Sequence, residues 1–330
     1  MANLRAGLIG LGMMGRHHAR VLASLEGVDL VAVADAGGDP HSVAGGRPIH
    51  ATVEELISER LDYCMVAVPT ALHEQIGLAL AEAGVHTMIE KPLAQDTPSA
   101  ERLAKAFADQ GLVGAVGHIE RYNPALQQAR ARLEAGELGD VYQVATRRQG
   151  PFPARIADVG VVKDLGTHDI DLTAWVTQQR YTSVAARTTY KSGREHEDLV
   201  AIVGQLSNGT VTNHLVNWLS PLKERVTIIT GERGAFVADT LTADLTFHAN
   251  GEVTTTWDDI SRFRGVSEGD TIRYAIAKPE PLRVEHQNFR DAVLGKDADI
   301  VTMSQGLEVV RVAEACIESA TTGRVVTLDG

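Results

Sequence analysis

The sequence is poor in cysteine and in aromatic residues, and it contains no long apolar run. Its 330 residues include only Cys64 and Cys316, which require no disulfide framework and fit a reducing cytoplasm. No stretch approaches the roughly 20 consecutive apolar residues of a membrane-spanning helix, so we expect no membrane partner. The apolar segment near the N-terminus is short and interrupted by glycines, which indicates a first strand rather than a signal peptide.

Positive charge is also scarce. The chain has 31 Lys and Arg residues against 43 Asp and Glu residues, for a formal net charge of −12. Nucleic-acid binding depends on clustered Lys and Arg, so this balance argues against a nucleic-acid partner, although a local cationic pocket remains compatible with it. The His, Asp and Glu residues show no compact metal-ligand spacing, and the two cysteines lie far apart, so we expect no metal site.

The chain does contain, close to its start, an apolar stretch followed by closely spaced glycines. Residues 4–9 read as a strand, and Gly10, Gly12 and Gly15 follow in the spacing G-x-G-x-x-G before a helical pattern. In this motif the first glycine allows a tight turn, the second lets the backbone approach a pyrophosphate, and the third allows close packing of strand and helix. The helix N-terminus offers its N–H groups to phosphate. The order of these parts predicts a dinucleotide-binding site.

An acidic residue at the end of the second predicted strand indicates which dinucleotide binds. Asp35 can accept hydrogen bonds from the ribose hydroxyls of the adenosine. It would repel a 2′-phosphate, and the residues that follow it, AGGDP, offer no arginine to bind one. We therefore expect NAD as the cofactor rather than NADP.

Strands and helices alternate through the first third of the chain, which predicts a doubly wound parallel Rossmann sheet over residues 1–120. Ligands bind beyond the carboxyl ends of the strands in such sheets. Glu90 and Lys91 follow one buried strand at that edge, and His118 ends another. The expected cofactor-binding residues are Gly10, Gly12, Met13, Met14, Gly15, Asp35, Pro69, Thr70, His73, Glu90 and Lys91.

From residue 121 onward, successive strand-like stretches replace the alternation. Asn208-Gly209 and Asn250-Gly251 are hairpin signals, and together these features indicate an antiparallel sheet. We therefore predict a second domain, of the α+β class, over residues 121–330. Its last helix, over about 303–322, would pack back near the first domain.

Three polar residues in the string KDLGTHDIDL fall on one face of a predicted helix. Asp164, His168 and Asp171 stand at i, i+4 and i+7, while Leu165, Leu172 and Val176 fall on another face and are expected in the core. The Gly- and Pro-rich segment before this helix would cover a substrate. The spacing alone leaves open whether Asp164 is a helix cap and His168 a half-buried structural residue.

The motifs GLIGLGMMGRHHARVL, VAVPTALHEQIGLALAEAGVHTMIEKPLA and KDLGTHDIDL together resemble the Gfo/Idh/MocA family, which is named for glucose–fructose oxidoreductase and inositol dehydrogenase. The resemblance covers nearly the full length, and its most specific part is E-K-P at Glu90 to Pro92 with D-x-x-x-H at Asp164 and His168. It implies a Rossmann domain followed by a large, mostly antiparallel, open-faced sheet that forms a homodimer or homotetramer. It also implies NAD(P)-linked oxidation or reduction of a sugar or cyclitol hydroxyl, and a cis Lys91–Pro92 bond.

The resemblance also implies residue roles. Lys91 stands at the family's catalytic-lysine position, with Asp164 and His168 as its partners. We expect His168 to accept the hydroxyl proton, because an imidazole with an ordinary pKa near 6.5 suits proton transfer at neutral pH. Lys91 would donate a hydrogen bond to the oxygen as negative charge develops, and Lys91 as the proton acceptor is an open alternative.

The expected substrate-binding residues are Lys91, Arg121, Tyr122, Asn123, Arg155, Asp164 and His168. Arg121 or Arg155 would bind a diphosphate through the planar guanidinium. Two alternatives stay open, namely an ion pair at the domain junction for Arg121 and an N-cap of the following helix for Asn123. His17 and His18, in the first helix, are expected to be structural.

Two further strings, VGHIERYNPAL and GPFPARIADVGVVKDLGTHDIDL, resemble a branch of UDP-N-acetylglucosamine 3-dehydrogenases, which oxidise the 3-hydroxyl of a UDP-amino sugar. The alternatives are an inositol or aldose dehydrogenase, a relative that uses bound NAD to cleave glycosides, and a dinucleotide-sensing regulator without turnover. The presence of Lys91, Asp164 and His168 argues against the regulator, because a sensor needs no proton-transfer groups.

Overall fold

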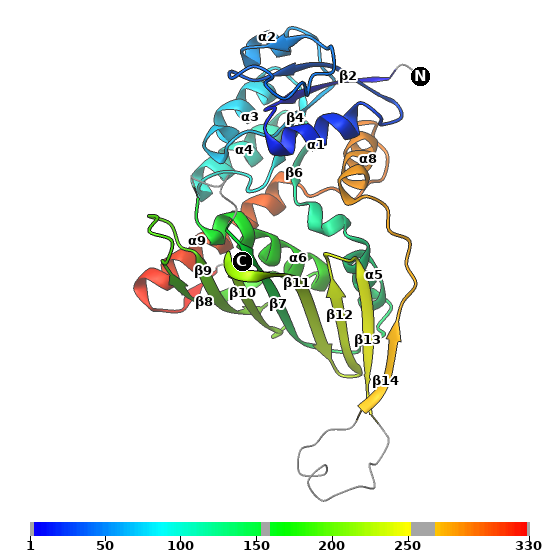
Figure 1. Ribbon diagram of the computed structural model, residues 1–330, viewed down its shortest axis with the longest axis vertical. Helices are drawn as coiled ribbons and strands as arrows, with labels where there is room; N and C mark the ends of the chain where they lie inside the picture. Colours follow the sequence, from blue (N-terminus) through cyan, green and yellow to red (C-terminus); the bar gives the residue numbers. More distant parts are fainter. Residues whose placement is uncertain (1–2, 153–158, 252–267, 329–330) are drawn as a thin grey trace, which may run out of the picture. The chain divides into compact units, whose positions relative to one another are not determined.

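The computed structural model of the protein describes residues 3–152, 159–251 and 268–328. The chain forms two compact units, and Figure 1 labels their helices and strands. Unit 1 comprises residues 1–122 and 279–314, and unit 2 comprises residues 123–278 and 315–330.

The units divide the chain differently from the predicted domains. The chain first passes from unit 1 to unit 2 after Tyr122, close to the predicted boundary after residue 120. Residues 279–314, which the prediction placed in the second domain, lie in unit 1. Helix α9 (Met303–Thr322) divides between the units after Glu314.

Unit 1 contains a six-stranded parallel sheet in the order β3-β2-β1-β4-β5-β6, as predicted. The order reverses between β1 and β4, and ligands bind at such a switch point in open parallel sheets. The strands are β1 (Leu4–Ile9), β2 (Val28–Ala34), β3 (Ile49–His50), β4 (Tyr63–Val66), β5 (His86–Glu90) and β6 (Gly114–Gly117).

Apolar residues cover both faces of this sheet, because consecutive strand residues point to opposite sides. One core cluster contains Leu80, Phe107 and Val310, and the other contains Leu22 and Phe289. The helices of unit 1 are α1 (Met13–Leu22), α2 (Val53–Ile57), α3 (His73–Glu82), α4 (Thr97–Asp109) and α8 (Pro281–Val293), with the 3₁₀ turns η1 (Thr70–Leu72) and η2 (Ile119–Tyr122). Within the described ranges, none of the protein's helices is long and apolar enough to cross a bilayer.

Unit 2 contains a large mixed sheet, and its described strands run in the order β14-β13-β12-β11-β7-β10-β9-β8-β15. Only β7 and β10 pair in parallel among these neighbours, so the predicted antiparallel character is confirmed. The strands are β7 (Val141–Pro151), β8 (Tyr181–Thr189), β9 (Leu199–Leu206), β10 (Val211–Asn217), β11 (Leu219–Gly231), β12 (Gly234–Asp239), β13 (Asp244–Asn250), β14 (Glu268–Arg273) and β15 (Val326–Thr327).

Helices α5 (Pro124–Glu134) and α6 (Thr167–Thr177) pack on one face of this sheet (Figure 1). Their apolar residues, among them Leu126 and Leu172, form a core with Ile229 and Phe236 of the sheet. Along β9 and β10, buried residues alternate with residues that are exposed or half-buried over most of each strand. One face of the sheet therefore carries the core of unit 2, and the other is open.

A buried carboxylate ties three segments of unit 2 together. Asp198 accepts hydrogen bonds from Trp218 Nε1 (2.7 Å), from the Ser192 hydroxyl (2.7 Å) and from the backbone N–H groups of Lys191 (2.6 Å) and Ser192 (2.8 Å). Burial works to raise the pKa of Asp198, but these donors outweigh it and lower the pKa to about 2. Because an unfolded aspartate has a pKa of about 3.9, this stabilisation is fully present above that pH and is lost as pH falls through about 2.

Replacing Asp198 with Asn should therefore destabilise the protein at neutral pH. We expect the free energy of unfolding to fall by about 2 kcal/mol at pH 7, since hydrogen bonds to charged groups contribute roughly 1.5–3 kcal/mol. Urea unfolding at pH 7 and pH 3 measures the effect, which should shrink at the lower pH. The exposed Asp297→Asn serves as control, and an equal loss at both pH values would contradict this account.

Candidate active site

The predicted glycine motif forms the turn between β1 and α1. Gly10 has a φ of 92°, a conformation that favours glycine, and a Cβ atom there would overlap the Ala67 carbonyl. A Cβ atom on Gly15 would overlap the carbonyl oxygen of Gly10, so this glycine allows strand and helix to approach closely. Gly12 is the N-cap of α1, and a Cβ atom on it would meet no protein atom within 4 Å. The space above Gly12 is therefore open to a ligand.

Asp35 follows β2 and lies against the same turn. Its carboxylate accepts hydrogen bonds from the backbone N–H groups of Leu11 (2.8 Å) and Gly37 (2.7 Å). The acidic group is half-buried beside the glycine turn, where a dinucleotide-binding sheet holds the adenosine ribose. An open helix N-terminus next to a ribose-binding carboxylate fits NAD. Met13 and Met14 begin α1 beside Gly12, and Met13 is exposed.

The E-K-P motif lies at the carboxyl end of β5. The Lys91–Pro92 bond is cis, as predicted, and Lys91 is half-buried. Glu90 is buried, and its Oε2 accepts a hydrogen bond from the backbone N–H of Lys91 (3.1 Å). Its Oε1 lies 2.9 Å from Nε2 of His18, a residue that the sequence indicated only as structural.

His73 connects two of the strand ends. Its ring nitrogens lie 3.0 Å from the carbonyl oxygen of Val68, which follows β4, and 2.9 Å from that of Pro92. Burial lowers the pKa of His73, against the effect of these two carbonyl groups. Both polar atoms of this predicted cofactor-binding side chain therefore have backbone partners. Pro69 is exposed and Thr70 is buried at the start of η1.

Two predicted substrate-binding residues have partners inside unit 1. Arg121 donates to the Gln305 side chain (3.0 Å), and the Tyr122 hydroxyl donates to the carbonyl of Asp299 (3.0 Å), all within unit 1. Both side chains are buried. Their contacts join η2 to residues 299–305, which belong to the second stretch of chain in unit 1.

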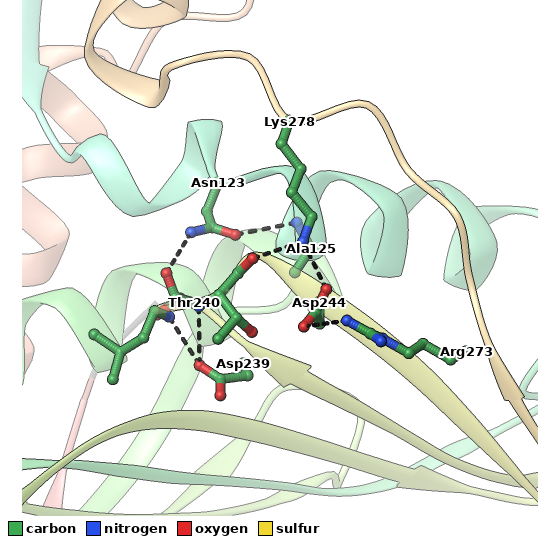
Figure 2. A network of polar contacts seen from close by, with 9 residues as sticks. Asn123, Ala125, Asp239, Thr240, Asp244, Arg273 and Lys278 are labelled. Carbon is green, nitrogen blue, oxygen red and sulfur yellow. Dashed lines mark hydrogen bonds and ion pairs between the residues drawn. The ribbon is translucent and has the colours of Figure 1, made fainter.

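Asn123 is the N-cap of α5, the alternative that the sequence left open. Its Oδ1 accepts from the Ala125 N–H (3.0 Å) and its Nδ2 donates to the Thr240 carbonyl (3.0 Å). Figure 2 shows these two contacts, and close by them Asp244 with its partners Arg273 and Lys278. Arg155 lies outside the described residues.

In unit 2, Asp164 and His168 lie on two different kinds of helical turn. Asp164 belongs to η3 (Val162–Gly166), which is π-helical, and His168 belongs to α6. The predicted regular α-helix therefore needs correction, because its first turn, with Asp164, is π-helical and has hydrogen bonds of the i to i+5 type. Asp164, His168 and Asp171 are all buried.

Two interactions that the sequence did not reveal hold these turns in place. Arg148 of β7 pairs with Asp169 of α6 at 2.8 Å, and both side chains are buried. Glu197 accepts a hydrogen bond from the backbone N–H of Val162 (3.0 Å) at the start of η3. Leu172 and Val176 lie in the core as predicted, whereas Leu165 is only half-buried. The segment that carries Asp164 and His168 is thus anchored at Val162 and at Asp169.

Two family models match the chain. The model described as "Oxidoreductase family, NAD-binding Rossmann fold" matches residues 4–118. The model described as "Oxidoreductase family, C-terminal alpha/beta domain" matches residues 130–328. The two matches together cover most of both compact units.

Curated relatives include two dehydrogenases. A UDP-N-acetylglucosamine 3-dehydrogenase from Acidithiobacillus ferrooxidans is 34% identical over 221 residues, which are 64% of this chain and 66% of that protein. Inositol 2-dehydrogenase 2 from Saccharopolyspora erythraea is 27% identical over 335 residues, which are 97% of this chain and 94% of that protein.

Similar solved structures include two of at least 25% identity. The UDP-N-acetylglucosamine 3-dehydrogenase of Acidithiobacillus ferrooxidans superimposes with a TM-score of 0.84 at 26% identity, covering 98% of this chain and 99% of that chain. GenD2 from gentamicin A biosynthesis, solved in complex with NAD, gives a TM-score of 0.81 at 25% identity, covering 100% of this chain and 97% of that chain.

The glycine geometry predicts different consequences for two alanine variants. Gly12→Ala should leave thermal stability unchanged, because its methyl group meets no protein atom, but should weaken NADH binding about 10-fold or more by entering the ligand's space, a change of roughly 1.4 kcal/mol. Gly15→Ala should lower the melting temperature, since its methyl group overlaps Gly10. Fluorescence titration with NADH and a thermal melt measure both. Unchanged NADH affinity in a folded Gly12→Ala variant would contradict this position of the cofactor.

Proposed function

Because the chain belongs to the Gfo/Idh/MocA oxidoreductase family, whose models describe an NAD-binding Rossmann fold, we propose that this NAD-dependent dehydrogenase acts on a secondary hydroxyl of a UDP-N-acetylamino sugar. The reaction is oxidation at the 3-hydroxyl. The observation that carries the proposal is Lys91, directly after β5 and at the same edge of the parallel sheet as the switch point between β1 and β4, where the glycine turn and Asp35 fit NAD.

Lys91 stabilises the substrate oxygen in this proposal. NAD, when bound, supplies the two-electron acceptor for the carbinol carbon. As that carbon is oxidised, its hydroxyl loses a proton and negative charge develops on the oxygen. The Lys91 ammonium group donates a hydrogen bond to this oxygen, and such preorganised donors contribute strongly to catalysis. Asp35 and the N-terminus of α1 hold the adenosine and pyrophosphate ends of the cofactor.

His168 removes the hydroxyl proton, and Asp164 orients this proton transfer. Both side chains are buried on a segment that the Arg148–Asp169 pair and Glu197 anchor, which suits groups that must meet a substrate in one geometry. The proposal requires that the reacting carbon reach Lys91 and His168 at the same time. Arg155, Arg121, Tyr122 and Asn123 stay proposed substrate contacts, the last three in addition to the partners described above.

An inositol dehydrogenase is the second candidate. The relative from Saccharopolyspora erythraea matches almost the full length of the chain and is named for inositol oxidation. The nucleotide sugar is preferred because the relative named for UDP-N-acetylglucosamine has the higher identity, 34% against 27%, and also superimposes over 98% of the chain.

A substrate panel tests the choice. The protein is incubated with NAD and, separately, with UDP-N-acetylglucosamine, its uronic acid, myo-inositol and glucose, and the near-ultraviolet absorbance of NADH is recorded. We expect NADH to form only with a nucleotide sugar. Formation with free polyols alone would establish the second candidate, and no reaction despite tight NAD binding would contradict a dehydrogenase.

Variants of the proposed catalytic residues supply the matched test. Lys91→Ala and His168→Ala should each reduce kcat by about 10²- to 10⁴-fold, the usual contribution of a positioned acid–base group. Their affinity for NADH should stay within a few fold of the parent protein. Normal turnover in both variants would contradict the assigned roles.

The open face of the large sheet is the proposed contact between copies of the chain. Val203 of β9, Ala145 of β7 and Ile228 of β11 lie in one row across the strands, with Asn213 of β10 between the first two. Val203 is 55% exposed and Ile228 is 37% exposed in the single chain, and large exposed apolar patches mark interaction sites. A homodimer or homotetramer formed through this row would bury them.

The free, buried thiols of Cys64 and Cys316 fit the expected cytoplasmic location.

Charged residues in this row should dissociate the assembly. The double variant Val203→Lys with Ile228→Lys is expected to shift the molar mass measured by light scattering from that of a dimer or tetramer to that of one chain. Tyr190→Lys, which changes an exposed residue outside the row, should leave the mass unaltered. A parent protein that is already monomeric would contradict the contact.

A further inference from the structure

Three buried polar side chains of unit 1 form a hydrogen-bonded chain that ends at the E-K-P motif. Nε2 of His18 in α1 lies 2.9 Å from Oε1 of Glu90, and Nδ1 of His18 lies 2.8 Å from Nε2 of His286 in α8. Both histidines are fully buried and Glu90 is 9% exposed. Helix α8 lies beside α1, so a segment far along the chain supplies the third member (Figure 1).

The surroundings of His286 determine its charge. Burial, together with the nearby charges of His18 and Arg283, lowers the pKa of His286 well below its ordinary value, so His286 is neutral and carries one N–H. Nδ1 of His286 has no hydrogen-bond partner within the described part of the chain. Nε2 of His286 and Nδ1 of His18 share one hydrogen bond, in which one ring nitrogen donates and the other accepts.

His18 then donates from Nε2 to the Glu90 carboxylate. Burial works to raise the pKa of Glu90, but the hydrogen bond from His18, with the charges of His18 and Lys91 and the Lys91 N–H, outweighs it and lowers the pKa. Glu90 is therefore an anion whose Oε1 binds His18 and whose Oε2 binds the backbone of Lys91. The titratable groups that face it are His18, Lys91 and His73, with His286 and Arg283 behind His18.

We propose that His18 and His286 are positioning residues for the reaction, which orient Glu90 and thereby fix the backbone and the charge environment of Lys91. The inference rests on the proposed function of Lys91 as the donor to the substrate oxygen. It assigns a role to a histidine pair that does not touch the substrate. It also gives a reason for the glutamate before the lysine, because the Glu90 anion and the Lys91 ammonium group interact electrostatically.

Two substitutions of His18 separate this role from simple packing. His18→Gln keeps an N–H donor at the reach of Nε2, so it should retain the bond to Glu90. His18→Asn is similarly polar, but its shorter side chain cannot reach Glu90. With NAD and UDP-N-acetylglucosamine, we expect Asn to lower kcat by about 10- to 100-fold and Gln by only a few fold, with KM for NAD unchanged in both. The exposed neighbour His17→Leu is the control and should behave like the parent protein.

The pH dependence adds a readout that packing would not move. Without the donor from His18, burial dominates and the pKa of Glu90 rises, so the acid limb of the kcat profile should move upward by about one pH unit in His18→Asn. The same titration is measured without substrate through the ¹³C-methyl resonance of reductively methylated Lys91, which is assigned by its absence in Lys91→Arg. This signal should report the Glu90 titration at higher pH in His18→Asn than in His18→Gln.

The two measurements keep the positioning role and the proposed reaction apart. A shifted Lys91 titration in a protein that oxidises no sugar of the panel would support the positioning role and contradict the reaction. Equal titration and equal kcat in the Asn and Gln variants, with a parent protein that turns over, would overturn the positioning role alone. If His18→Asn fails to fold, His286→Asn is compared with His286→Gln, because His286 is one hydrogen bond further from Glu90 than His18. Equal Lys91 titration and equal kcat in these two variants would overturn the role.

Discussion

The parallel alignment of the strands in unit 1 is the constraint on which the proposed site depends. Since all paired neighbours of the sheet run in the same direction, the turns after β1, β2, β4 and β5 come out at one edge. Gly10, Asp35 and Lys91, which are far apart in sequence, therefore share that edge. A reversed β5 would carry Lys91 to the opposite edge, and neither the glycine turn nor Asp35 could then act on a common ligand with it.

Hydrogen bonds between the turns keep this edge in one conformation. His73 joins the segment after β4 to the one after β5, Asp35 joins the segment after β2 to the glycine turn, and His18 joins α1 to Glu90. Each of these polar groups is at least partly removed from water, so leaving its partner unpaired would be costly. The edge is thus held by charge and hydrogen bonding, while apolar packing on both faces holds the sheet itself.

Features with local causes could be predicted from the sequence, and features with distant causes could not. The glycine motif, the parallel sheet and the cis bond before Pro92 follow from neighbouring residues or from the family resemblance, and all are present. Two adjacent histidines in one helix gave no sign of which is buried, because the partner of His18 is at residue 286, in a helix that was not predicted. The π turn at Asp164 begins at Val162, whose N–H group donates to Glu197, again a distant residue.

The most direct test of the central claim is a crystal structure of the protein with NADH and UDP-N-acetylglucosamine. The account predicts that Asp35 contacts the adenosine ribose, and that Lys91 Nζ and the His168 ring both lie within hydrogen-bond distance of the sugar hydroxyl next to the nicotinamide. A Lys91 side chain that points into solvent, away from the nicotinamide, would contradict it and leave a protein that only binds the nucleotide.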